Sequence, residues 1–272
     1  MDDQLLKRVQ QISRDILKVV DEACRKNGID YTIAYGTMLG AVRHGGFIPW
    51  DDDVDLVMTA DNYEKFLAVC DDILPGYLKV ECAERNPDYP FNFAKVVDTR
   101  TTFIESDFRK LKYLKGVSVD IFPAYRIRDD EKTIKSISRK NRMNAIFKTA
   151  YDGSCIARYK GLKKVCMAII HVAAKCVGLK NLNKKEIRRM EKEHAKGGTK
   201  TLVEYNFPRT MPYATYEDTT DYTFDGMTVR GVRDYDCYLK AEFGDYMSLP
   251  PVEQRVCHID KTSQIDLDKP CK

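Results

Sequence analysis

The hydrophobic positions at the start of the chain recur every three or four residues, which is the period of an amphipathic helix. The positions that follow this spacing are Leu5, Val9, Ile12, Ile16, Val19 and Ala23. Gly28, directly after Lys26-Asn27, is a typical helix stop. The pattern predicts a helix that buries one face and ends near Lys26.

Beyond this helix, short β-branched and apolar runs alternate with glycine, proline and acidic residues, which is typical of strands separated by turns. The runs that predict strands are IDYTIAYG (29–36), VDLVM (54–58), YLKVECAE (77–84), FNFAKVVD (91–98), TTFIE (101–105) and GVSVDIFPAY (116–125, with a stop at Pro123). Two helices are predicted between them, TMLGAVR (37–43) and ADNYEKFLAVCDDI (60–73, capped by Thr59 or Asp61). The mixture indicates an α/β (α+β) fold.

The composition changes over residues 128–200, where Lys and Arg far outnumber Asp and Glu and strand patterns disappear. Residues 162–180 have an apolar middle with lysines at both ends, so this segment either packs internally or lies on an anionic membrane surface. The tail predicts a hairpin at Asp225-Gly226 and a helix ended by Gly244. We therefore expect a core of strands and helices over residues 1–127, a basic helical insertion over 128–200, and a C-terminal segment over 201–272 that closes over the core.

Bulk composition narrows the class of protein only slightly. A hydrophobic content of 43%, a charged content of 32% and a net charge of +4 describe an ordinary globular chain that suits anionic substrates and gives no argument for nucleic acid. The N-terminal residues are charged throughout and do not form an export signal. With nine cysteines and no C-x-x-C pair, we expect reduced thiols in a cytoplasmic protein.

Four aspartates crowd the stretch PWDDDVDLVM, directly before an apolar run: Asp51, Asp52, Asp53 and Asp55. Carboxylates two residues apart on a strand point to the same face, where they repel one another unless a cation neutralises them. All-oxygen ligands favour Mg²⁺ or Mn²⁺. Asp120, the charged residue of the apolar run VSVDIF, is the best candidate for a third ligand, and it is equally a candidate proton acceptor.

Upstream of these acids, Gly36-Thr37 stands where a strand is predicted to turn into a helix, and free N–H groups at a helix start attract phosphate oxygens. Together, an anion cradle and a metal pair serve phosphoryl transfer. Arg43 and His44 follow on the same helix as candidate phosphate-site residues, although Arg43 could instead pair with the aspartates. Lys95 either faces the site and neutralises bound phosphate groups, or it points to solvent from an edge strand.

The acidic stretch has three other interpretations. A surface loop conflicts with the neighbouring Trp50 and apolar run, and a calcium loop lacks the required glycine and glutamate, because Leu56 and Asn62 stand at those positions. A D-x-D glycosyltransferase remains an alternative, although it would not require the glycine-threonine turn. His258 and an aromatic cage for a cationic headgroup stay unassigned.

The string YGTMLGAVRHGGFIPWDDDVDLVM (35–58) resembles the signature of the LicD family, which includes bacterial phosphocholine transferases and is related to fukutin-type proteins. A Gly-Thr turn, an h-D-x-D-h strand and a third strand aspartate also match the nucleotidyltransferase superfamily. The segments FAKVVDTRTTF, GVSVDIFP and YMSLPPVEQRVCHID extend the similarity. The resemblance implies a nucleotidyltransferase-like mixed sheet flanked by helices, with Asp53, Asp55 and Asp120 as metal ligands and Gly36 and Thr37 on the donor phosphate.

The same resemblance implies a function. A phosphoalkyl group, typically phosphocholine, would pass from a CDP-linked donor to a hydroxyl of a cell-surface glycan such as teichoic acid, capsule or lipopolysaccharide, and CMP would leave. One alternative is a nucleotidyltransferase that uses CTP or another NTP on a sugar or phosphonate; another is an inactive scaffold, against which the three aspartates argue. Because such acceptors are often lipid-linked, we expect peripheral contact through 162–180 with the inner face of the plasma membrane.

Overall fold

The computed structural model describes residues 3–105, 108–202, 210–255, 257, 259 and 263–271. In these ranges, nine strands form one mixed sheet in the order β3-β4-β6-β2-β1-β10-β9, and β7 and β8 continue it from β6. The bounds of these strands are β1 Thr32–Ile33, β2 Asp55–Thr59, β3 Leu78–Glu81, β4 Ala94–Asp98, β6 Ser118–Ile127, β7 Lys200–Leu202, β8 Met211–Pro212, β9 Thr219–Phe224 and β10 Met227–Val232. A separate pair joins β5 Thr102–Ile104 to β11 Gln264–Asp266. The predicted α/β class, a mixed sheet flanked by helices, is confirmed.

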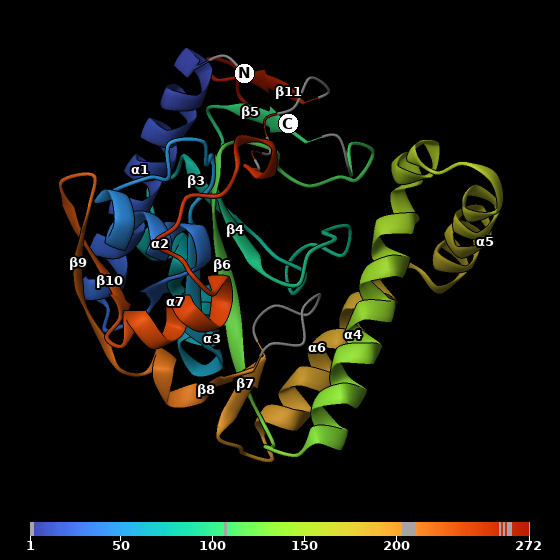
Figure 1. Cartoon of the computed structure of the whole chain (residues 1–272). Helices are drawn as coiled ribbons and strands as arrows, with labels where there is room; N and C mark the ends of the chain where they lie inside the picture. The colour runs from blue at the N-terminus through green and yellow to red at the C-terminus, as the bar shows by residue number, and fades with distance from the viewer. Residues whose placement is uncertain are drawn as a thin grey trace.

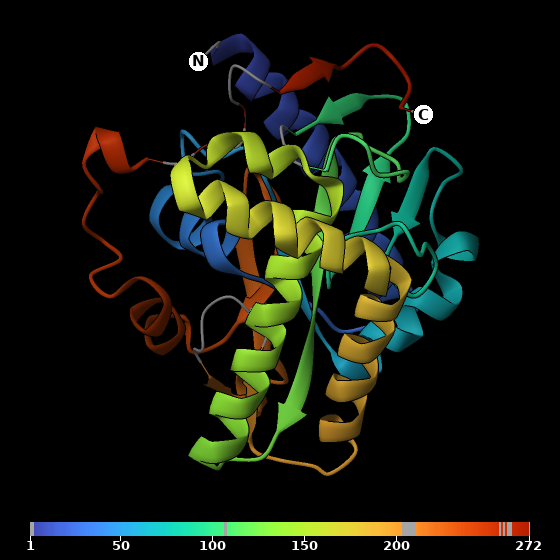
Figure 2. The same ribbon diagram turned by 90° about the vertical axis from the view of Figure 1, so that its right-hand side faces the viewer.

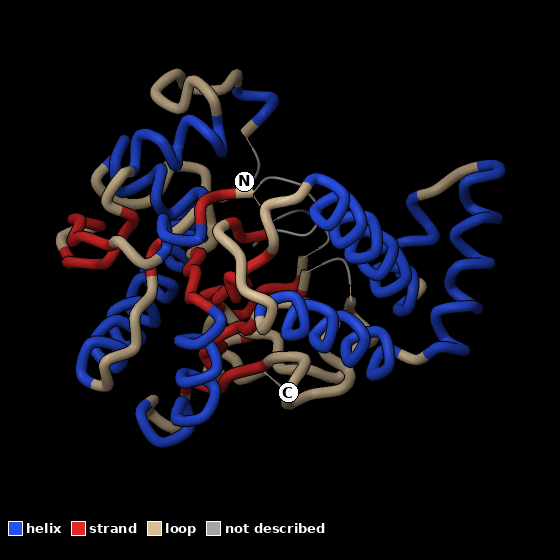
Figure 3. The backbone as a smooth tube through the Cα atoms, turned by 90° about the horizontal axis from the view of Figure 1, so that it is seen from below, coloured by secondary structure: helices blue, strands red, loops and turns tan. Residues whose placement is uncertain are grey.

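The helices surround this sheet on both sides (Figure 1). Their bounds are α1 Asp3–Lys26, α2 Tyr35–His44, α3 Ala60–Ile73, α4 Glu131–Asp152, α5 Gly161–Val177, α6 Leu179–His194 and α7 Tyr235–Phe243, with short 3₁₀ turns η1 Ser154–Arg158, η2 Tyr213–Tyr216 and η3 Val252–Gln254. Figure 2 shows α4, α5 and α6 together on one side of the sheet. Seen from below, the strands occupy the middle and these three helices extend away from them (Figure 3).

The central strand β6 divides the molecule into a packed face and an open face. Val119 and Ile121 are fully buried in a core to which α1 and α3 contribute Ile16 and Phe66. Alternation along the strand then turns Asp120 and its neighbours at 118 and 122 to the opposite face, where they line a cavity. The packed face therefore fixes the strand that carries the candidate site.

Several predicted strand boundaries were wrong, and the structure explains two of them. The run 29–36 forms a strand only at Thr32–Ile33, because the chain turns at Tyr35, whose φ is +45°, and Gly36 already belongs to α2. Pro123 does not stop β6, which continues to Ile127. The missing N–H of Pro123 breaks no hydrogen bond with β4 or β7, because pairing with β4 ends at Ile121 and pairing with β7 begins at Tyr125.

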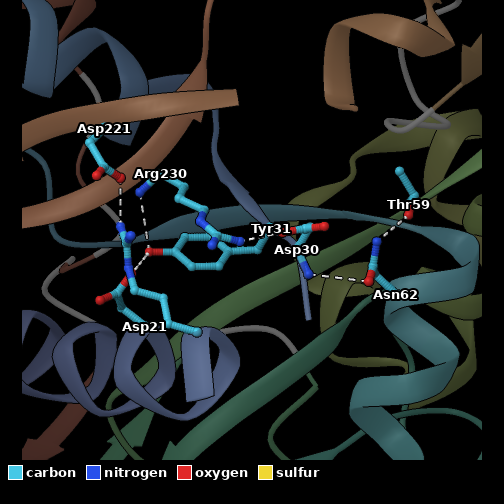
Figure 4. Close-up of polar contacts among 8 residues, drawn as sticks. Asp21, Asp30, Tyr31, Thr59, Asn62, Asp221 and Arg230 are labelled. Carbon is cyan, nitrogen blue, oxygen red and sulfur yellow. Dashed lines mark hydrogen bonds and ion pairs between the residues drawn. The ribbon is translucent and has the colours of Figure 1, made fainter. Parts of the chain in front are cut away.

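A polar network holds the strand that leads into α2 (Figure 4). The Tyr31 hydroxyl donates to Asp21 of α1 at 2.6 Å and accepts the Arg230 N–H of β10 at 3.3 Å. The Arg25 guanidinium bridges Asp21 and Asp221 at 2.6 and 2.7 Å, which ties α1 to the β9–β10 hairpin. The network therefore holds Tyr31, the residue before β1, against α1 and β10, and β1 leads into α2.

Candidate active site

Three charged side chains stand in one row across β4, β6 and β2. Asp120 is the register partner of Lys95 on one side and of Asp55 on the other. Residues paired in this way project from the same face of a sheet. The Lys95 ammonium donates to both carboxylate oxygens of Asp120 at 2.9 Å. The structure thus brings together Lys95, Asp120 and Asp55, which lie far apart in the sequence.

Burial and neighbouring charges shift the pKa values of the three side chains in this row. Burial and the neighbouring Asp53 and Asp120 raise the pKa of Asp55 well above its usual range. Burial also raises the pKa of Asp120 to about 6, and the Lys95 ammonium keeps it from rising further. For Lys95, burial lowers the pKa, but the Asp120 and Glu105 carboxylates outweigh burial and the net pKa is raised. A further positive charge would relieve the repulsion at Asp55.

Asp53 lies two residues before Asp55, just outside β2, which begins at Asp55. Both residues line the cavity, and the intervening Val54 is fully buried on the other side. Asp52 is also buried and also lines the cavity, whereas Asp51 reaches the start of α2: a Cβ added to Gly36 would lie 2.5 Å from its Oδ2 atom. Glycine at this position therefore allows the Asp51 carboxylate to approach the helix.

Gly36 lines the same cavity from the first turn of α2, where N–H groups have no acceptor within the helix. Thr37 is placed differently. Its side chain is buried, and its hydroxyl accepts the Asp55 N–H at 2.8 Å. Thr37 therefore anchors the strand that carries Asp55 to the helix that carries Gly36, and it does not line the cavity with its side chain.

The structure does not bring Arg43 and His44 to this cavity. The Arg43 guanidinium donates to the Tyr246 carbonyl at 2.7 Å and to His44 Nε2 at 3.0 Å. The His44 ring packs against Trp50 with centroids 6.5 Å apart. Both residues stand on the last turn of α2, whereas Gly36 stands on its first turn. Arg43 therefore connects α2 to the C-terminal segment, and His44 packs against Trp50.

The cavity has a volume of about 710 Å³ and two different walls. The charged wall holds the row and its acidic neighbours. The other wall is aromatic: Phe91 stacks on Phe93 with centroids 5.0 Å apart, and Phe93 lies 4.4 Å from Phe122. The Lys95 ammonium lies 5.3 Å from the Phe91 ring, where the two walls meet. Phe122 was missed in the sequence, although its position two residues after Asp120 predicts the same face.

A second cavity, of about 740 Å³, adjoins the first through Tyr113, Leu114 and Lys115, which line both. Its other charged lining residues are basic except for Glu81. Glu81 is already engaged, since it accepts the Leu114 N–H at 3.1 Å and the Asn86 amide at 2.9 Å. The remaining basic residues are Arg109, Lys110, Lys112 and Lys269. The second cavity is therefore positively charged.

The carboxylate oxygens of Asp53, Asp55 and Asp120 are the candidate ligands for a divalent cation. Among the described residues, no three His, Cys, Asp or Glu side chains converge closely enough to enclose a metal ion. The chemistry of Asp53, Asp55 and Asp120 nevertheless fits a hard cation, because all ligand atoms are carboxylate oxygens and the buried Asp55 bears the repulsion of both neighbours. His258 lies outside the described residues.

A mixed sheet, an aspartate-lined cavity and a helix that begins beside it are the features expected of a LicD-like transferase, and the comparisons with known proteins support that class. Residues 28–151 match the family described as LicD/FKTN/FKRP, nucleotidyltransferase domain. The chain is 29% identical to the lipopolysaccharide cholinephosphotransferase LicD of Haemophilus influenzae over 93% of this chain and 95% of that protein. It is 30% identical to the ribitol 5-phosphate transferase FKRP of Homo sapiens over 44% of this chain and 21% of that protein. The predicted family and its transferase class are confirmed.

Proposed function

We propose that this protein transfers a phosphoalkyl group, phosphocholine above all, from a CDP-linked donor to a hydroxyl of a cell-surface glycan, with release of CMP. The observation that carries the proposal is the Lys95–Asp120–Asp55 row, which lies in one cavity with Gly36. The two named relatives transfer different phosphoalcohols, cholinephosphate and ribitol 5-phosphate. A shared site for the phosphate, with a variable pocket for the alcohol, accounts for both.

We assign Asp53, Asp55 and Asp120 as the residues that would hold Mg²⁺ or Mn²⁺. Such an ion supplies charge neutralisation for the phosphates and for the leaving group. The remaining contributions come from the chain itself: the Gly36 N–H offers a donor to a phosphate oxygen, and Lys95 adds a fixed positive charge next to Asp120. Thr37 fixes the backbone at Asp55.

We assign the alcohol headgroup to the aromatic wall. Faces of phenylalanine rings attract quaternary ammonium groups, and Phe91, Phe93 and Phe122 line the first cavity. We assign the acceptor to the second, basic cavity, which would favour a glycan that carries phosphate or carboxylate groups. The shared residues 113–115 would then separate donor and acceptor. The nine cysteines, all of which lie in the described residues, form no disulfide, which supports a cytoplasmic location.

The test is incubation with a panel of CDP-alcohols, a purified glycan acceptor and Mg²⁺ or Mn²⁺, with CMP measured by chromatography. We expect CMP release with CDP-choline, and a loss of about a hundredfold or more in Asp53→Asn and Asp55→Asn proteins. The matched control is Asp72→Asn, an exposed aspartate on α3. Pyrophosphate released from CTP would instead indicate a nucleotidyltransferase, and turnover of nucleotide sugars alone would indicate a glycosyltransferase.

A further inference from the structure

Helix α5 is scarcely covered by the rest of the described chain. Ala174 is the one residue of its 17 that is buried. One side of the helix rests on α4, where the His171 Nδ1 atom lies 2.7 Å from the Ala150 carbonyl and the Lys175 ammonium lies 3.9 Å from the centroid of the Tyr151 ring. These contacts fix α5 in place and leave its other side open.

The open side carries a continuous apolar stripe. Leu162, Val165, Ile169 and Val172 are 78%, 55%, 65% and 61% exposed. Their spacing of three, four and three residues places them on one helix face. Scattered exposed apolar residues are ordinary, but four in a row on one helix indicate a surface that another body covers.

The charge around the stripe indicates what kind of surface covers it. From residue 153 to residue 185 the sequence contains no Asp or Glu, whereas it contains Arg158 and seven lysines. Two of these lysines, Lys163 and Lys164, are exposed on α5 itself. Such a face repels a second copy of itself and is attracted to a negatively charged surface.

Helix α5 differs in length and composition from a helix that crosses a membrane. Within the described residues, no single helix is long and apolar enough to span a bilayer; α5 and α6 pass the test only as a pair bent by 80°. The second member of that pair is engaged elsewhere, because Leu182 and Met190 of α6 are buried in the protein. We propose that α5 docks in the plane of an anionic lipid bilayer, with the stripe 162–172 in the acyl boundary and the lysines at the headgroups.

This inference concerns lipid binding and does not depend on the proposed function. It does have a consequence for it, since docking through α5 would hold both cavities at a lipid surface, where a lipid-linked acceptor would be concentrated. Figure 1 shows α5 at the margin of the molecule, away from the sheet, and Figure 2, which looks at that side, shows it in front of the other elements, so it can reach a flat surface.

The test is flotation of the full chain with vesicles of phosphatidylcholine alone or with about one third phosphatidylglycerol, at low and high salt. We expect binding to the anionic vesicles at low salt, and about a tenfold or greater loss in the Val165→Ser/Ile169→Ser double variant. Lys163→Glu/Lys164→Glu should abolish the dependence on phosphatidylglycerol. Both pairs are exposed, so circular dichroism should show unchanged folding.

The matched control is Met247→Ser/Leu249→Ser, because these residues are 58% and 56% exposed but lie outside α5. The control should float like the wild type. The proposal is overturned if the wild type does not bind anionic vesicles at low salt, or if the α5 variant binds as well as the control. It is also overturned if light scattering shows a wild-type oligomer that the α5 variant dissociates, because the stripe would then be an interface between copies.

Discussion

At the scale of single residues, the Thr37 hydroxyl connects the first turn of α2 to the strand that carries Asp55. It is buried and accepts the Asp55 N–H at 2.8 Å. Thr37→Val keeps the shape of the side chain but leaves that N–H without its acceptor, so we expect a loss of about 1–3 kcal/mol in the free energy of unfolding. Thr37→Ser keeps the acceptor and should lose less. Urea denaturation measures both, and equal losses would contradict this role.

Lys95 is the counter-charge of Asp120, and both side chains are largely buried. Lys95→Met leaves a buried carboxylate without its partner, which we expect to cost about 3 kcal/mol of unfolding free energy in metal-free buffer. A divalent cation at the aspartates would replace the lost charge. Mn²⁺ should therefore raise the melting temperature of Lys95→Met more than that of the wild type.

Calorimetry of the Lys95→Met protein in EDTA and in Mn²⁺ separates the loss of the ion pair from the stabilisation by the cation. The Asp72→Asn protein again serves as the control, because this exposed side chain on α3 does not line the cavity that holds the row. An identical Mn²⁺ shift in the Lys95→Met and wild-type proteins would show that the ion does not bind next to Asp120.

Periodicity predicted which residues share a face, but it could not predict which strands are neighbours. Asp53 and Asp55, two residues apart, could be placed together from the sequence alone. The register of Asp120 against both Asp55 and Lys95 depends on the strand order β4-β6-β2, which arises from packing across the whole sheet. The same limit misled the placement of Arg43, whose carbonyl partner at Tyr246 is 203 residues away.

At the scale of elements, α2 contains a glycine that helix propensity would replace. Gly40 lies inside the helix, where alanine would normally add about 1 kcal/mol of stability. A Cβ at Gly40, however, would lie 2.3 Å from the backbone oxygen of Gly46. We therefore expect Gly40→Ala to destabilise the protein by about 2 kcal/mol, because the loop leading to the aspartates would have to move.

The comparison for Gly40 is Gly76→Ala, since a Cβ at Gly76 would meet nothing within 4 Å. Thermal and urea unfolding should show Gly76→Ala within about 0.5 kcal/mol of the wild type. A neutral or stabilising Gly40→Ala would mean that α2 and the Gly46 loop are not packed closely, and that the approach of α2 to Asp51 is looser than described.

Most elements were predictable because their signals are local. Helix α1 ends at Lys26 and the Asp225-Gly226 turn joins β9 to β10, as the patterns predicted. The turn has φ values of +46° and +75° at these residues, which explains the choice of Asp-Gly. The exceptions, the short β1 and the continuation of β6 through Pro123, depend on neighbouring strands that local sequence does not identify.

At the scale of the whole molecule, charge is divided between the two cavities. The first contains the aspartates and the second contains the basic residues, with residues 113–115 lining both. A net charge of +4 conceals this division, because opposite charges of separate sites cancel in the sum. Under the proposed function, the two cavities would receive two substrates of different charge, the donor and an anionic acceptor.

The division of charge makes a kinetic prediction. Lys110→Ala/Lys112→Ala removes two exposed positive charges from the second cavity. We expect the KM for an anionic glycan acceptor to rise about tenfold, because each lost contact weakens ground-state attraction, while the KM for the CDP-linked donor stays unchanged. The control Lys7→Ala/Lys18→Ala makes the same change in net charge on exposed positions of α1. If both pairs raise the acceptor KM equally, the effect belongs to the field of the whole protein. If the donor KM rises with Lys110→Ala/Lys112→Ala, the basic cavity holds part of the donor, and the acceptor must enter elsewhere.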